Sequence, residues 1–182
     1  TTWNTPRTTS NVTLDPGQWS LDNFGEVLIA TISNGKTFTW NAGATNARLV
    51  RASTSTSGFS TSANPTASRF TLVSDRDRHV FHFGTETTIG SVNDYTPTAT
   101  NTSGTFRLDT GNEIRGAVQG KDYTLVLTDS AAYIIQFIGA PFTFSVRQVG
   151  TNCGLIGQNA LSYSNGRIFW MSGEPNKHWI LC

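Results

Sequence analysis

The stretch that decides the fold is residues 113–149, EIRGAVQGKDYTLVLTDSAAYIIQFIGAPFTFSVRQV. It contains runs rich in β-branched and aromatic residues, at Glu113–Val118, Tyr123–Thr128, Ala131–Ile138 and Phe142–Val149. The separators between these runs are short and contain Gly, Asp, Ser or Pro, which are turn residues. Connections of this length join neighbouring antiparallel strands. The stretch therefore predicts a four-stranded antiparallel meander.

Similar runs occur on both sides of this meander. Further strands are expected at Glu26–Ile32, Lys36–Trp40, Arg69–Ser74, His79–Phe83, Ala160–Ser164, Arg167–Met171 and His178–Leu181. Asn34-Gly35 predicts a type I′ hairpin turn, because this turn needs positive φ at both central residues. Residues 1–24 are polar and predict an extended N-terminal arm, while Ser53–Ser68 and Thr85–Gly104 predict long loops.

The predicted strands repeat along the chain. Leu28, Phe81, Val126 and Phe169 occupy matching positions at spacings of 53, 45 and 43 residues. A period of about 40–50 residues with four strands is typical of β-propeller blades, which cover one another's faces around a common axis. The sequence therefore predicts one all-β, propeller-like domain over residues 25–182. Its blade units of four-stranded antiparallel meanders are expected near 25–52, 69–110, 113–149 and 160–182.

Two aspects of this prediction stay open. The alternating pattern also fits a β-sandwich or an irregular β-fold. Four blades would just close the smallest propeller, but the last strand run ends at Cys182 in the middle of an apolar sequence. This position favours an incomplete ring, or a piece of a longer polypeptide.

Composition narrows the range of functions. The chain has 182 residues, a net charge of +1 and only 14% charged residues, with 28 Thr and 17 Ser. Near-neutral charge argues against specific nucleic-acid binding and against an anionic membrane partner. No apolar run reaches the length of a transmembrane helix, so no membrane span is expected. Cys153 and Cys182 are too few for a disulfide framework and are expected to be buried free thiols.

The densest ionisable cluster is Asp75–His79, with His82 close behind. A spacing of three residues places His79 and His82 on opposite faces of a strand, which disfavours a shared metal ion. The alternating charges predict a solvated hairpin tip that pairs with itself. The sequence contains none of the phosphate-loop, zinc-protease or serine-hydrolase motifs.

Two sets of residues are candidates for functional sites. A hydrolase on a propeller could use carboxylates, drawn from Asp94, Asp109, Glu113, Asp122 and Asp129, but no spacing selects a pair. Turn or solvent roles are expected for all five. Aromatic side chains in loops could bind a glycan or receptor, namely Trp3, Trp19 and Tyr95, whereas core positions are expected for Trp40, Phe169 and Trp170. No catalytic, cofactor-binding or metal-binding residue is assigned, and the chain is not expected to be an enzyme or to need a cofactor.

Several segments of the sequence resemble those of a known group of proteins. They are Gln136–Phe144, Gly150–Gly157 and Asn165–Met171, with Gln18–Glu26, Ser74–His79 and Tyr95–Thr102 upstream. The chain resembles large virion structural proteins of tailed bacteriophages, particularly marine phages and cyanophages. Its order of elements is also similar to the propeller of tail nozzle proteins in short-tailed phages. The sequence differs from the family between Gly90 and Asp94, where the family has a longer insert that is absent from this chain.

The resemblance implies a structural protein of the virion, in the tail, nozzle, neck or baseplate, that acts through contacts between subunits. Its partners would be other virion proteins and copies of itself, and a host surface glycan is a further candidate. The loops Ser53–Ser68 and Thr85–Gly104 would be contact elements. Two alternatives remain open at this point: a receptor- or glycan-binding module of the tail tip, and a propeller-fold glycan hydrolase.

Overall fold

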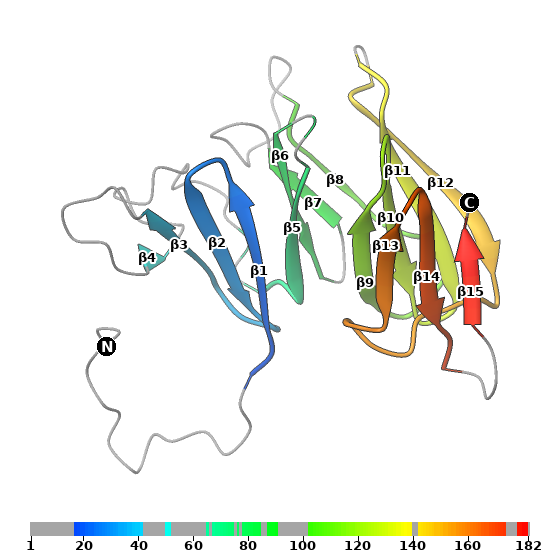
Figure 1. The fold of residues 1–182 in the computed structure, drawn as a ribbon. Coiled ribbons are helices and arrows are strands. Elements are labelled where there is room, and N and C mark those ends of the chain that lie inside the picture. The colour runs from blue at the N-terminus through cyan, green and yellow to red at the C-terminus, as the bar shows by residue number, and fades with distance from the viewer. Residues whose placement is uncertain are drawn as a thin grey trace, which may run out of the picture.

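The computed structural model describes residues 17–41, 50–51, 65, 67–74, 76, 78–84, 87–90, 102–139, 142–173 and 178–181. These residues form strands, turns and irregular segments, so the prediction of an all-β fold is confirmed. Within the same residues, no helix of membrane-spanning length and hydropathy is found. The strands make up four small antiparallel sheets (Figure 1).

Each sheet is a meander whose strands pair in chain order. The first sheet has strands β1 (Trp19–Phe24), β2 (Val27–Ile32), β3 (Thr37–Asn41) and β4 (Val50–Arg51). The second has β5 (Phe70–Ser74), β6 (His79–Phe83), β7 (Thr87–Gly90) and β8 (Gly104–Phe106). The third has β9 (Ile114–Gln119), β10 (Thr124–Thr128), β11 (Ala131–Phe137) and β12 (Phe144–Thr151). The described part of the fourth has β13 (Leu161–Ser164), β14 (Arg167–Met171) and β15 (His178–Leu181).

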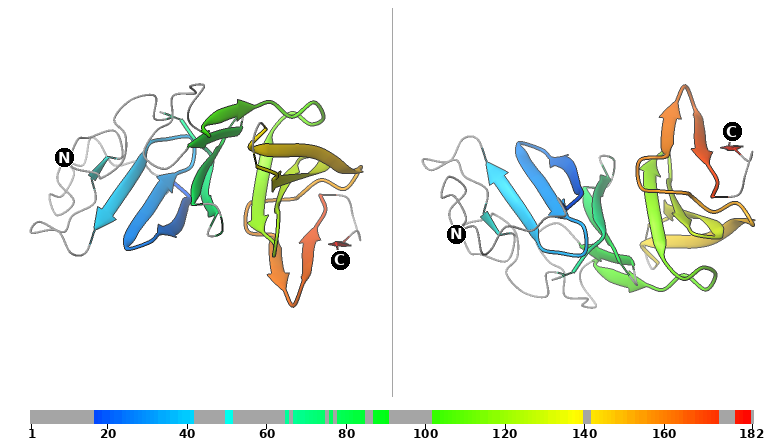
Figure 2. Two further views of the ribbon diagram at one scale, coloured as in Figure 1. Left: turned by 90° about the horizontal axis from the view of Figure 1, so that it is seen from above. Right: turned by 90° about the horizontal axis from the view of Figure 1, so that it is seen from below.

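The four sheets follow one another in chain order along an open arc (Figure 2). Their first strands lie next to one another: β1 lies against β5, β5 against β9, and β9 against β13, and β2 also contacts β5. The first and last sheets lie at the two ends of the arc (Figure 2). The repeat predicted from the sequence has a structural counterpart, because all four anchor residues lie in the second strand of a sheet: Leu28, Phe81, Val126 and Phe169.

Every strand expected from the sequence overlaps an observed strand, but the structure adds strands where none was expected. The predicted arm is wrong at its end, since residues 19–24 form β1 and pair with β2. The predicted loop over Thr85–Gly104 is also wrong in part, because it contains β7 and the start of β8. Of the other long loop, most lies outside the described residues, but Ser68 is buried and bridged to Gly35.

The turn at Asn34 differs from its prediction. Asn34 has a φ of 56°, but Gly35 is not in the positive-φ region, so this is not a type I′ turn. Instead, the Gly35 amide donates to the carbonyl oxygen of Ile32 at 2.9 Å. The pair Asn165-Gly166 does have the two positive φ values that type I′ needs, 48° and 82°.

The third sheet shows why the sheets need one another. One of its faces contributes Val126, Tyr133 and Ile135 to a core shared with Phe81 and other residues of the second sheet. The opposite face contributes Leu125, Leu127 and Ile134 to a second core, which includes Ile168 and Trp170 of the fourth sheet. A single four-stranded sheet leaves both faces in water, so the neighbouring sheets supply the burial that stabilises it.

The interface between the first and second sheets is different in chemistry. Its apolar part is small, with Ile29 packed on Val73 and Val80. Buried hydroxyl groups fill much of the rest: Thr31 shares hydrogen bonds with both Thr37 and Thr71. Side chains of β1 also bond directly to the open edge of β5. The amide of Thr71 donates to Ser20 Oγ at 3.0 Å.

The same edge receives a carboxylate. The amide of Val73 donates to Asp22 Oδ2 at 2.7 Å. Together, Ser20 and Asp22 satisfy two backbone donors of a first strand that has no hydrogen-bonded neighbour on that side. We call each contact between successive sheets a joint. The first joint has a small apolar part and relies mainly on directional hydrogen bonds, whereas the second and third joints bury the two large apolar cores.

Candidate functional site

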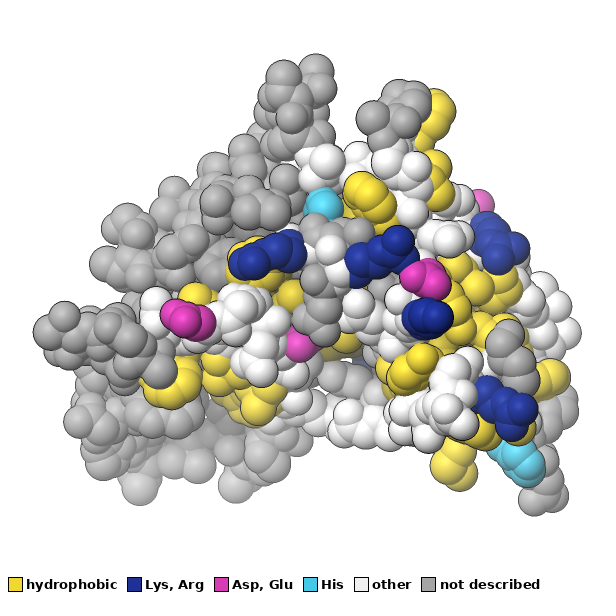
Figure 3. Space-filling view, turned by 45° about the horizontal axis from the view of Figure 1, so that its top comes forward, with side chains coloured by type: hydrophobic (Ala, Val, Ile, Leu, Met, Phe, Trp, Pro, Cys, Tyr) yellow, Lys and Arg dark blue, Asp and Glu magenta, His cyan; other side chains and the backbone are white. Residues whose placement is uncertain are grey.

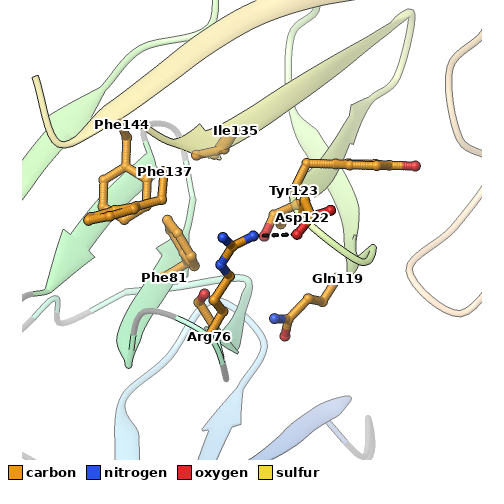
Figure 4. Close-up of a pocket in the computed structure, with 10 residues that line it drawn as sticks. Arg76, Phe81, Gln119, Asp122, Tyr123, Ile135, Phe137 and Phe144 are labelled. Carbon is orange, nitrogen blue, oxygen red and sulfur yellow. Dashed lines mark hydrogen bonds and ion pairs between the residues drawn. The ribbon is translucent and has the colours of Figure 1, made fainter. Parts of the chain in front are cut away.

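A narrow cleft lies at the seam between the second and third sheets (Figure 4). The guanidinium of Arg76, in the β5–β6 turn, pairs with the carboxylate of Asp122, in the turn before β10. Aromatic side chains, including Phe81, Phe137 and Phe144, line the other side. The space is about 10 Å³, which is room for one water molecule. The cleft is therefore a packed seam and is too small to hold an organic ligand.

The charged turn does not have the structure that the sequence predicted. Asp75 and Asp77 lie outside the described residues. Arg76 pairs with Asp122 of the next sheet, and the Arg78 guanidinium carbon lies 5.1 Å from the ring centroid of Phe24 in the preceding sheet. The prediction of a tip that pairs only with itself is wrong, because both described arginines reach neighbouring sheets.

The two histidines of β6 point in opposite directions, as their spacing predicts. The His79 ring meets Phe144 of the third sheet edge-on, with centroids 4.9 Å apart. His82 Nδ1 lies 3.3 Å from Ser68 Oγ and 3.5 Å from Thr37 Oγ1, on the side of the first sheet. Burial lowers the pKa of His82 from 6.5 to about 3, so this ring is neutral at pH 7. Among the described residues, no group of His, Cys, Asp and Glu could hold a metal ion.

The carboxylates considered from the sequence do not converge. Asp94 lies outside the described residues, and Asp109 is exposed. Glu113 and Asp122 lie at opposite ends of β9. Asp129 lies at the same end as Glu113, and its amide donates to the Glu113 carbonyl oxygen at 3.1 Å.

Each of the two neighbouring carboxylates already has hydrogen-bond donors. The guanidinium groups of Arg115 and Arg69 hold the pKa of Glu113 below its usual range. Burial alone would raise the pKa of Asp129, but two hydrogen bonds from Asn112, at 2.9 and 3.0 Å, keep it below its usual range. These carboxylates therefore tie segments together, and neither has the raised pKa of a general acid.

The aromatic residues are placed partly as expected. Trp3 and Tyr95 lie outside the described residues. Trp19 is 45% exposed, and its ring lies 6.0 Å from that of Phe38. Trp170 is buried as predicted, and its Nε1 donates to the Cys153 carbonyl oxygen at 2.8 Å.

Two of the aromatic predictions are wrong. Trp40 and Phe169 were expected in the core, but they are 36% and 39% exposed. Cys153 is buried and free as predicted, and Cys182 lies outside the described residues.

A wider hollow than the cleft between the second and third sheets lies on the fourth sheet. It has a volume of about 300 Å³ and is lined by Phe169, Met171, Ile180 and neighbouring residues of β13, β14 and β15. Strand pairing places Phe169 opposite Ile180, on the face turned away from the third sheet. We call this surface the trailing face. Figure 3 shows hydrophobic side chains gathered at this end of the molecule.

A second apolar surface lies at the other end of the arc. Pairing places Trp19, Leu21 and Trp40 on the face of the first sheet opposite to Ser20 and Asp22, which contact the second sheet. Leu21 is 64% exposed. We call this surface the leading face. Sequence reasoning missed both faces, although one signal was present: in β14 both alternating sets are apolar, with Ile168 and Trp170 on one side and Phe169 and Met171 on the other.

Comparison with protein-family models finds no match to this sequence. Comparison with curated proteins likewise finds no similar sequence.

Proposed function

We propose that this chain is a structural component of a bacteriophage virion, in the tail, nozzle or baseplate, and that it acts through contacts between subunits. The sequence phrases that resemble virion proteins support this proposal, and they extend over most of the chain. The low charge and high Thr and Ser content of 28 and 17 residues also suit β-surfaces that pack against neighbouring subunits.

We infer further that the four sheets are blades of an incomplete propeller. Contacts between successive first strands support this inference, since first strands line the axis of a propeller. The two-sided burial of the third sheet supports it as well, because each propeller blade is covered by both of its neighbours. On this view the open arc holds part of a ring.

The observation that carries the proposal is the pair of apolar faces at the ends of the arc. On the trailing face, Met171 and Ile180 are 60% and 54% exposed, and on the leading face Leu21 is 64% exposed. Contiguous apolar surface of this kind marks a protein interface. Glu113, Asp122 and Asp129 bind arginine or asparagine side chains of the same chain, which suits a scaffold better than a catalytic site.

The test is to locate the protein in virus particles. Antibodies raised against the purified chain are applied to density-purified phage particles from the source of the sequence, and bound gold is imaged by electron microscopy. Gold at one fixed position on the tail or neck supports the proposal. Intact particles that carry no gold and yield no peptide of this chain by mass spectrometry contradict it.

A glycan-binding role at the tail tip is the second candidate. The exposed indole rings of Trp19 and Trp40 on one sheet face favour it, because sugar rings stack on such surfaces. A glycan array separates the two functions. Glycan binding by the unmodified chain that is lost in both Trp19→Ala and Trp40→Ala, with the fold retained, favours the glycan-binding role. A glycan array on which the chain binds nothing rules that role out.

A further inference from the structure

The contacts between successive sheets repeat at their turns. The turn between the first and second strands of one sheet meets the corresponding turn of the next. Phe24, at the β1–β2 turn, lies under Arg78 of the β5–β6 turn. Arg76 of that turn then pairs with Asp122, at the β9–β10 turn. Each joint in the first half of the array thus has a turn-to-turn contact involving a charged side chain.

The two ends of the array carry charged residues at the same kind of turn. Glu26 lies in the β1–β2 turn, and Arg167 directly follows the β13–β14 turn. Both are exposed. Figure 1 shows these two turns at the same, upper end of the molecule. Their charges are opposite, so a repeat of the internal joint between two molecules would bring Glu26 and Arg167 together.

The sheet faces at the two ends also match. Each internal joint buries the following face of one sheet against the preceding face of the next. The trailing face, with Phe169 and Ile180, has no following sheet in the described residues, and the leading face, with Trp19 and Leu21, has no preceding one. The two surfaces are therefore the two halves of one further joint.

We propose that a second copy of this chain docks head to tail, with its leading face on the trailing face of the first copy and its Glu26 beside Arg167. This inference rests on the proposed function, because it names the partner and the surface through which the scaffold assembles. The contact joins different surfaces of the two copies, so it continues from copy to copy. It gives a ring where the rotations close and an open filament where they do not.

The experiment measures the mass of the full chain by sedimentation over a range of concentrations. Leu21→Asp blocks the leading face and Phe169→Asp blocks the trailing face. Each variant alone is expected to stay monomeric, while an equal mixture forms a dimer and nothing larger, since each copy keeps one working face. Phe142→Asp is the matched control, because Phe142 is 72% exposed on the β11–β12 hairpin, away from both faces, and should assemble like the unmodified chain.

Charge reversal provides a second test that leaves the apolar faces intact. Glu26→Arg and Arg167→Glu should each weaken association about fivefold, as expected for loss of one rim ion pair, and the double variant should recover it. Association of either aspartate variant alone at the unmodified level overturns the proposal, as does a mixture that stays monomeric or a double variant without recovery. An unmodified chain that stays monomeric also overturns the proposal of head-to-tail docking. Gold labelling of virus particles tests the proposed structural role independently.

Discussion

His82 makes the stability of the fold sensitive to mild acid. Its side chain is 1% exposed and lies beside Ser68 and Thr37, between the first two sheets. Burial lowers the pKa of this imidazole from 6.5 to about 3. The unfolded chain therefore binds a proton at this position once the pH falls below 6.5, whereas the folded protein does not until about pH 3. Acid consequently favours the unfolded state across this window.

The size of the effect follows from linkage. Each pH unit within the window removes about 1.4 kcal/mol of unfolding free energy, so lowering the pH from 7 to 5 should remove about 2 kcal/mol. This is a large part of the total for a small domain, which is about 5–15 kcal/mol. Urea unfolding followed by tryptophan fluorescence at pH 7, 6 and 5 measures it. Above pH 5 the lowered pKa values of Glu113 and Asp129 contribute little, because their unfolded-state carboxyl groups are still ionised.

His82→Gln supplies the control. Glutamine keeps a polar side chain of similar size but does not titrate, so the variant should lose most of the slope between pH 7 and 5, even where its stability at pH 7 is lower. A slope that is the same in the variant and the unmodified chain would refute the assignment to His82. So would an unfolding free energy that does not change between pH 7 and 5.

Two further predictions concern the segment that connects the third and fourth sheets, between β12 and β13. Gly154→Ala should destabilise the fold by about 3 kcal/mol, because the new methyl group would overlap the backbone of Asp129. Gly157→Ala, where nothing lies within 4 Å, should change the unfolding free energy by less than about 0.5 kcal/mol, and equal effects at the two sites would contradict the packing argument. In a Cys182→Ser background, burial and the raised pKa of Cys153 should slow its reaction with a thiol reagent about 100-fold relative to the unfolded chain. Equal rates in the folded and unfolded chain would show that this thiol is accessible.

The strands that sequence could predict are those with strong local signals. β6 and β14 were expected at their observed bounds, because alternating or continuous apolar residues and a nearby turn mark each of them. β7 and β8 were missed, since they contain mainly Thr and Gly and form strands by pairing in turn, β7 with β6 and β8 with β7. β1 was assigned to an arm for a similar reason: its alternating polar residues bond to β5, a strand about fifty residues further along the chain.

The candidate surfaces were harder to predict because they depend on which segments meet. Local sequence places Arg76 in a charged turn, but only the fold brings it to Asp122. Phe169 reads as a core residue in every local pattern, and its exposure results from its position in the last described sheet of the array. The resemblance to virion proteins supplied the proposed role, while the geometry supplied the surfaces on which that role can be tested.

The contrast between hydroxyl-lined and hydrocarbon-lined joints affects how accurately the sheets are aligned. The attraction between apolar surfaces has no preferred direction, so sliding one sheet over the other by a fraction of a residue changes the interaction energy little. Thr31, Thr71 and His82 accept only one alignment, because a displaced hydroxyl would lose its bond while still shielded from water. The hydrogen bonds of the first joint therefore fix how the second sheet is aligned on the first, and with it the orientation of the sheets that follow.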